Sequence, residues 1–127
     1  MSSAEARPYT ILVVDDDPDI REIVADILAD EGFRTLGAEN GRQALRMLRE
    51  DGLRPNLILL DMMMPELDGW GFRAEQQRDA ELAAIPVVVF TAHELPGHTA
   101  DQMQAAGFLK KPIRLNQLLD AVRRVCP

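Results

Sequence analysis

Three apolar runs of this sequence end on side chains that can hold a metal ion or a phosphoryl group. These side chains are Asp15, Asp16, Asp61 and Thr91, and a fourth, shorter apolar run leads into Lys111. Runs of four or five apolar residues without alternation are typical of strands buried on both faces, as in parallel sheets. Because ligands of such sheets bind outside the carboxyl ends of the strands, we expect these groups to meet at one edge.

The carboxylates of Asp15, Asp16 and Asp61 predict a cation site. Two such charges about 4 Å apart repel by roughly 4 kcal/mol at an effective dielectric constant near 20, unless a cation or protons intervene. Mg²⁺ fits best because it prefers oxygen ligands and keeps several of its waters. These segments contain no His or Cys, which disfavours zinc and copper. Taken alone, the acidic run could simply cap a helix, but the other end-of-strand groups favour a site.

Thr91 and Lys111 add what phosphoryl transfer requires. An ammonium group can neutralise Asp61 or pair with phosphoryl oxygens, and a hydroxyl can donate a hydrogen bond to the same oxygens. Phosphoryl transfer depends mainly on positioning and charge neutralisation. Carboxylates can form acyl phosphates, so Asp61 is the expected nucleophile.

Strand and helix patterns alternate five times along the chain. The expected strands are 11–14, 33–38, 57–60, 87–90 and 108–109, and the expected helices are 20–28, 44–48, 69–79, 99–106 and 115–122. Asp17 and Pro18 are suited to begin the first helix, and Asn40 and Gln43 form a possible capping box for the second. This alternation predicts an α/β fold, an open parallel sheet with helices on both faces.

The composition limits the kinds of function. The chain has 127 residues, 46% of them hydrophobic and 28% charged, which is typical of one globular domain. The net charge of −7 argues against direct binding of nucleic acid. No apolar stretch is long enough to span a membrane, the start lacks a signal-peptide pattern, and Cys126 is the single cysteine. A cytoplasmic location is therefore expected.

Five short stretches carry a family resemblance. They are Leu12-Val13-Val14-Asp15-Asp16-Asp17, Leu60-Asp61-Met62-Met63-Met64-Pro65, Asp68-Gly69, Phe90-Thr91-Ala92 and Lys111-Pro112. In this order and spacing, the chain from about Thr10 to Val125 resembles the receiver domain of two-component response regulators, most closely the stand-alone chemotaxis-regulator type. The resemblance implies a flavodoxin-like, doubly wound (βα)5 fold with strand order 2-1-3-4-5. Residues 1–8 are then a flexible tail and residues 9–127 the receiver domain.

The resemblance also implies roles at the expected metal site. Asp61 looks like the phosphoacceptor. Asp16, Asp61 and the backbone carbonyl of Met63 look like direct Mg²⁺ ligands, and Asp15 is expected to act through water.

Further roles are implied for the last strands. Thr91 and Lys111 look like the pair that holds the phosphoryl oxygens. Thr91 and Phe108 look like the switch, in which the hydroxyl moves toward the phosphoryl group and the aromatic ring turns into the vacated space. The Lys111–Pro112 peptide bond is expected to be cis, which proline permits.

In function, the resemblance implies a single-domain response regulator that takes its phosphoryl group from a histidine kinase or a histidine phosphotransfer protein. Such a protein catalyses only its own phosphorylation and dephosphorylation, and changes the surface it presents to a downstream partner protein. The alternatives are a receiver excised from a hybrid kinase, a phosphorelay intermediate and a phosphate sink. No membrane partner is expected.

Some positions depart from the family pattern. The stretch between Thr91 and Lys111 looks about two residues short, and Pro96-Gly97 falls where the fourth helix often begins. Arg114 stands at a helix start and opposes the helix dipole, so a frayed first turn is expected. His93 lies two positions beyond Thr91 and could influence the water that hydrolyses the phosphorylated Asp61. A histidine in a surface loop is the simpler interpretation.

Other classes of protein fit less well. Phosphatases with an aspartate nucleophile usually carry a second acid two positions later, where this chain has Met63. A flavodoxin would have a Ser/Thr/Gly-rich phosphate loop after its first strand in place of the acidic run. A pseudo-receiver, which only binds partner proteins and is not phosphorylated, tends to lose the acids or the lysine. This chain keeps all of them.

Overall fold

The fold is built on one sheet of five parallel strands. A computed structural model describes residues 9–92 and 103–127. The strands are β1 (Thr10–Val14), β2 (Arg34–Ala38), β3 (Leu57–Asp61), β4 (Val87–Thr91) and β5 (Gly107–Lys110). Their order in the sheet is β2-β1-β3-β4-β5, which confirms the predicted doubly wound parallel sheet.

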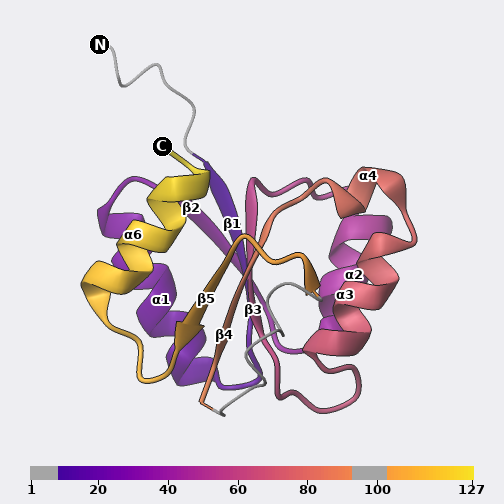
Figure 1. The fold of residues 1–127 in the computed structure, drawn as a ribbon, viewed down its shortest axis with the longest axis horizontal. Helices are drawn as coiled ribbons and strands as arrows, with labels where there is room; N and C mark the ends of the chain where they lie inside the picture. The colour runs from indigo at the N-terminus through magenta and orange to yellow at the C-terminus, as the bar shows by residue number, and fades with distance from the viewer. Residues whose placement is uncertain (1–8, 93–102) are drawn as a thin grey trace.

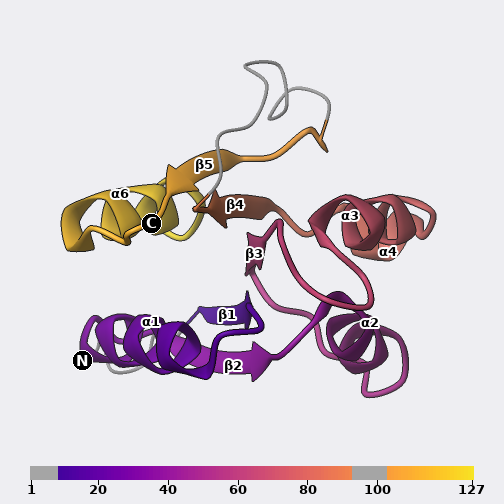
Figure 2. The ribbon, with the colours of Figure 1, turned by 90° about the horizontal axis from the view of Figure 1, so that it is seen from below.

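Helices cover both faces of this sheet. They are α1 (Pro18–Asp30), α2 (Gly41–Arg49), α3 (Gly69–Gln77), α4 (Ala80–Ala83) and α6 (Leu115–Val125). In Figures 1 and 2, α1 and α6 lie on one side of the sheet, and α2, α3 and α4 lie on the other. This arrangement confirms the three-layer α/β architecture.

Alternate residues of the central strands pack into two separate cores. Leu12 and Val14 of β1 join the core under α2 and α3. Ile11 and Val13, which point the opposite way, join the core under α1 and α6. The strands β1, β3 and β4 are buried on both faces, so nearly all of their residues are apolar. This is why these strands can be predicted from the sequence.

Helix starts follow the expected capping chemistry, with one variation. The side chain of Asp17 accepts a hydrogen bond from the amide of Asp19, and that of Asn40 accepts one from the amide of Gln43. The Gln43 side chain bonds the amide of Glu39, one residue before the cap, so the capping box is not closed in its standard form. Arg114 precedes α6 without a side-chain cap bond, as expected; fraying of the first turn stays a prediction.

The predicted helix over 69–79 is too long. The helix α3 ends at Gln77, and the separate turn α4 begins at Ala80. The side chain of Asp79 accepts a hydrogen bond from the amide of Glu81, so it caps a new helix in place of continuing the old one. Of the helix expected over 99–106, residues 99–102 lie outside the described residues, as does the expected tail 1–8; Met103 is helical and Gln104 lies in a turn.

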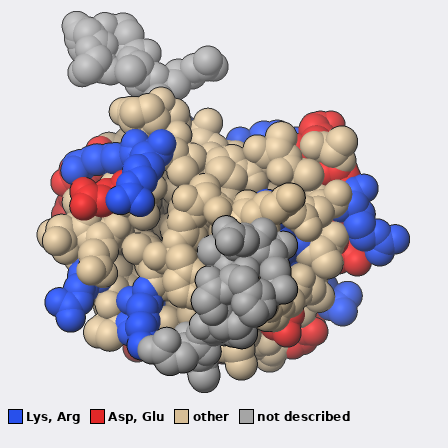
Figure 3. Space-filling model, viewed as in Figure 1, with Lys and Arg blue, Asp and Glu red and all other residues tan. Residues whose placement is uncertain are grey.

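Figure 3 shows charges of both signs at the left and at the right of the face that it draws, with other residues between them. Among the described residues, no helix combines the length and the apolar character needed to cross a membrane.

Candidate functional site

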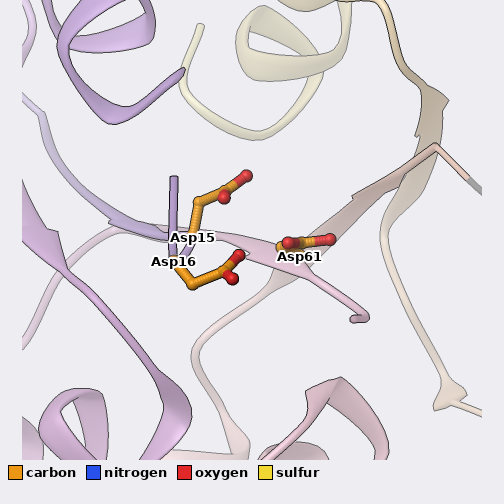
Figure 4. A group of neighbouring side chains, drawn as sticks. All are labelled: Asp15, Asp16 and Asp61. Carbon is orange, nitrogen blue, oxygen red and sulfur yellow. The ribbon is translucent and has the colours of Figure 1, made fainter. Parts of the chain in front are cut away.

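Three carboxylates meet at the carboxyl edge of the sheet. Asp61 is the last residue of β3, and Asp15 directly follows β1, whose Val14 pairs in register with Leu60. One oxygen from each of Asp15, Asp16 and Asp61 lies within 4.8 Å of the others. Figure 4 shows the three side chains extending from two neighbouring strand ends into the same space. Asp15 and Asp61 are buried, whereas Asp16 is exposed.

Local hydrogen bonds orient the two buried carboxylates. The Asp15 side chain accepts a bond from the amide of Asp17 at 2.8 Å, where α1 is about to begin. The Asp61 side chain accepts a longer bond, 3.3 Å, from the amide of Met63. Each acid thus has one oxygen fixed by the loop that follows its strand.

Lys111 enters the cluster from the loop after β5. Its ammonium nitrogen lies 2.8 Å from Oδ2 of Asp15 and 3.5 Å from Oδ2 of Asp61. It also lies 5.0 Å from the centre of the Phe90 ring, and its amide donates to the carbonyl of Thr91. The Lys111–Pro112 bond is cis, as the resemblance implied. Asp15, not Asp61, is therefore the nearest carboxylate partner of Lys111.

The electrostatics of the cluster favour the arrival of a cation. Burial and then the charge of Asp15 raise the pKa of Asp61 to about 6, against the opposing effects of Lys111 and the Met63 amide. Burial disfavours the charged form of Lys111, but the hydrogen bond and charge of Asp15, with the charge of Asp61, raise its pKa overall. Oxygen donors alone, with one exposed carboxylate beside two buried ones, fit Mg²⁺, which keeps part of its water shell.

The raised pKa of Asp61 predicts how stability depends on pH. Below the unfolded-state value of 3.8, both states hold the proton; between that value and about 6, the folded state binds more protons. The free energy of unfolding therefore falls as pH rises through this window. In EDTA, the Asp61→Asn variant should be more stable than the wild type at about pH 7.5, and this advantage should shrink at about pH 4.5. Urea unfolding at both pH values checks this; an advantage that does not change with pH would contradict it.

The predicted switch residues take the following places. Thr91 ends β4 and is fully buried, one residue beyond Phe90, which pairs with Asp61. Phe108 pairs with Val89 and is 39% exposed on β5. The turning of Phe108 and the metal-binding role of the Met63 carbonyl stay predictions, and His93 and Pro96-Gly97 lie outside the described residues.

The sequence reasoning missed the structural importance of Gly69. A Cβ atom on this residue would lie 2.8 Å from Cα of Met62 and 3.0 Å from the carbonyl oxygen of Asp61. The first turn of α3 is thus packed directly on the backbone that carries Asp61. The Asp68-Gly69 pair belongs to the motifs that carry the family resemblance, but nothing in a single sequence indicates this close approach.

Comparison with known proteins gives a consistent result. Residues 11–123 match the family model described as "Response regulator receiver domain". The chain is 40% identical over 118 residues to the positive alginate biosynthesis regulatory protein of Pseudomonas aeruginosa. That alignment covers 90% of this chain but only 46% of the relative, so the chain spans about half the length of this curated protein.

Two solved structures illustrate the likeness of fold. The signal receiver domain of a signal transduction histidine kinase from Syntrophus aciditrophicus has a TM-score of 0.81 and 33% identity, with 92% of this chain and 89% of that one covered. The chemotaxis protein CheY4 of Vibrio cholerae, crystallised at low pH, has a TM-score of 0.82 and 29% identity, with 93% and 98% covered.

Proposed function

This chain belongs to the family of response regulator receiver domains, and on that premise we propose that it acts as a phosphorylation switch with Asp61 as the phosphoacceptor. The observation that carries the proposal is the meeting of Asp61, two further acids and Lys111 at one edge of the sheet. A nucleophile, a cation site and an ammonium group at one place are what phosphoryl transfer to a carboxylate needs.

The chemistry follows from the positions of these groups. An oxygen of Asp61 attacks the phosphorus of a phosphohistidine on a histidine kinase or phosphotransfer protein; the P–O bond forms and the P–N bond to the imidazole breaks. Lys111, 3.5 Å from Oδ2 of Asp61, is close enough to follow the transferred oxygens. The hydroxyl of Thr91 donates a hydrogen bond to the same oxygens. Hydrolysis of the acyl phosphate by water then resets the switch.

Mg²⁺ is the cofactor that the acidic cluster suits. We assign Asp16, Asp61 and the carbonyl of Met63 as its direct ligands and Asp15 as a ligand through water. When bound, the ion neutralises charge between the acids and the incoming phosphoryl group. The 2.8 Å contact of Asp15 with Lys111 supports the indirect role of Asp15, because one of its oxygens already has a cationic partner.

The change in the surface that is offered to a partner protein depends on Thr91 and Phe108. Phosphorylation adds negative charge and acceptor oxygens beside Thr91, which biases an equilibrium between two arrangements of β4 and β5. Phe108, half-exposed on β5, can then turn inward and change the surface offered to a partner protein.

The setting of this switch has two candidate forms. The first is a single-domain, cytoplasmic regulator that acts on a downstream protein, catalyses no reaction beyond its own phosphorylation and dephosphorylation, and binds neither nucleic acid nor membrane. The second is a receiver within a larger chain, which the likeness to a kinase receiver and to a relative of about twice the length favours. A relay intermediate or a phosphate sink would use the same site.

Incubation with acetyl phosphate and Mg²⁺, followed by intact mass measurement, tests the proposal. We expect a gain of one phosphoryl group that is absent in EDTA. A titration with Mg²⁺, recorded by the fluorescence of Trp70, the single tryptophan, then tests the metal site. The Asp16→Asn variant should bind Mg²⁺ about tenfold more weakly or worse, because it loses a charged ligand. Phosphorylation that proceeds equally well in EDTA would contradict the assignment of the metal site.

A further inference from the structure

A buried arginine lies on the inner face of α3, away from the acidic cluster. Arg73 is only 6% exposed, and its neighbour Gln76 is fully buried. The guanidinium donates to the carbonyl of Met103 at 2.8 Å, to the carbonyl of Gln104 at 3.1 Å and to Oε1 of Gln76 at 2.7 Å. In the described part of the chain, no carboxylate pairs with it. A buried charge held by neutral oxygens alone costs stability unless its hydrogen bonds are well made.

Gln76 holds this guanidinium in a fixed direction. Its amide nitrogen donates to the carbonyls of Leu82 at 2.8 Å and Ile85 at 3.0 Å. With both amide protons bound, its oxygen faces Arg73. The helix α4 and Ile85, which follows it, therefore orient Gln76, and through it the arginine, toward the segment that precedes β5.

That segment needs to be held, because Gln104 has an unfavourable backbone conformation. Its φ of 55° lies in the left-handed region, which residues other than glycine rarely adopt. Two side chains of α3 bind it: Arg73 bonds its carbonyl, and Gln77 bonds its side chain at 3.2 Å. Two residues later, the amide of Ala106 donates to the carbonyl of Val87 at 2.7 Å, where the pairing of β5 with β4 begins.

We infer that Arg73 is a positioning residue that fixes the segment 103–106, and thereby the edge strand β5, against α3. Among the described strands, β5 pairs with β4 alone, so its position depends on how this segment is held. The first turn of the same helix packs on the backbone of Asp61 and Met62. The helix α3 thus connects the acidic cluster to the strand that carries Phe108, by a route separate from Thr91. The use of the β5 surface for output rests on the proposed function; the fixing of the segment does not.

Amide hydrogen exchange of the whole chain tests this role. The Arg73→Met variant keeps the apolar part of the side chain and loses every hydrogen-bond donor of the guanidinium. Arg73→Lys keeps the positive charge but loses the planar arrangement of several N–H groups. Hydrogen bonds to a charged group are strong enough that their loss should speed exchange at the Ala106 amide by about tenfold or more. The amide of Asp15, which bonds Ala38 on the far side of the sheet, should keep its wild-type rate. The exchange rate at Ala106 in Arg73→Lys should lie between those of the wild type and Arg73→Met. Arg46→Met, a change at an exposed arginine of α2, should alter neither amide.

The outcomes separate positioning from general stability. Equal acceleration at Ala106 and Asp15, or none at Ala106, would overturn the inference. If Arg73→Met does not fold, Arg73→Lys alone decides by the same comparison. In the wild type, phosphorylation should change exchange in β5, and Arg73→Met should reduce this change at least about twofold while phosphoryl uptake by mass stays normal. Failure of the wild type to take up phosphate would instead refute the proposed function and leave the exchange comparison in unphosphorylated protein valid.

Discussion

Replacing Asp61 by Asn will leave the protein without a phosphoryl group after incubation with acetyl phosphate and Mg²⁺. The amide keeps the shape of the side chain but is not a nucleophile toward phosphorus, so the expected loss is complete. Intact mass spectrometry measures it directly. The variant should remain folded, because it removes a buried charge whose ionisation the fold already disfavours.

A matched variant shows whether this loss is specific. Asp51→Asn makes the same chemical change at an exposed position after α2 and should be phosphorylated like the wild type. If Asp61→Asn still gained one phosphoryl group, another side chain would be the acceptor and the assignment of Asp61 would be wrong.

Replacing Gly69 by Ala will destabilise the protein strongly. The new methyl group would lie 2.6 Å from Sδ and 2.8 Å from Cα of Met62, and only the sulfur can move without shifting the backbone. Overpacking of this kind costs about 1–3 kcal/mol, and the loss of helix-disfavouring glycine returns about 1 kcal/mol. The free energy of unfolding should therefore fall by about 2 kcal/mol. This is the difference between the upper end of the overpacking cost, which applies because main-chain atoms must shift, and the gain in helix propensity. Urea unfolding measures it, and slower phosphoryl uptake should accompany it.

Gly71→Ala is the control for this effect. It lies in the same helix, but the atom closest to its added Cβ, at 2.5 Å, is Cδ1 of Leu67, the end of a flexible side chain. This variant should be close to the wild type in stability, or above it, because alanine favours the helix. Equal destabilisation by both substitutions would show that the contact with the Asp61–Met62 backbone is not the cause.

The fold was largely predictable because its central strands are buried on both faces. The runs before Asp15, Asp61 and Thr91 therefore stand out in the sequence, and their shared direction places these residues at one edge. The strand order came from the family resemblance, since apolar periodicity does not determine which strands are neighbours. The break between α3 and α4 was missed because Asp79 can either continue a helix or cap a new one, and tertiary packing decides between them.

The meeting of the three acids and Lys111 at one edge was predictable, but their individual contacts were not. The sequence identified Lys111 as a partner for Asp61, whereas the structure places it nearer to Asp15. Arg73 and Gln76 gave no signal, because polar residues on a helix are ordinarily exposed. The carbonyls that Arg73 bonds come from Met103 and Gln104, about thirty residues away, and those that Gln76 bonds come from Leu82 and Ile85.

The most direct test of the account is to locate the phosphoryl group within the chain. Reduction of the phosphorylated protein with borohydride converts an aspartyl phosphate to homoserine, and peptide mass spectrometry then identifies the residue. We expect homoserine at position 61 alone, in the sample with Mg²⁺ and not in the sample with EDTA. Homoserine at position 15 or 16, or phosphate found only on a residue outside the acidic cluster, would contradict the account.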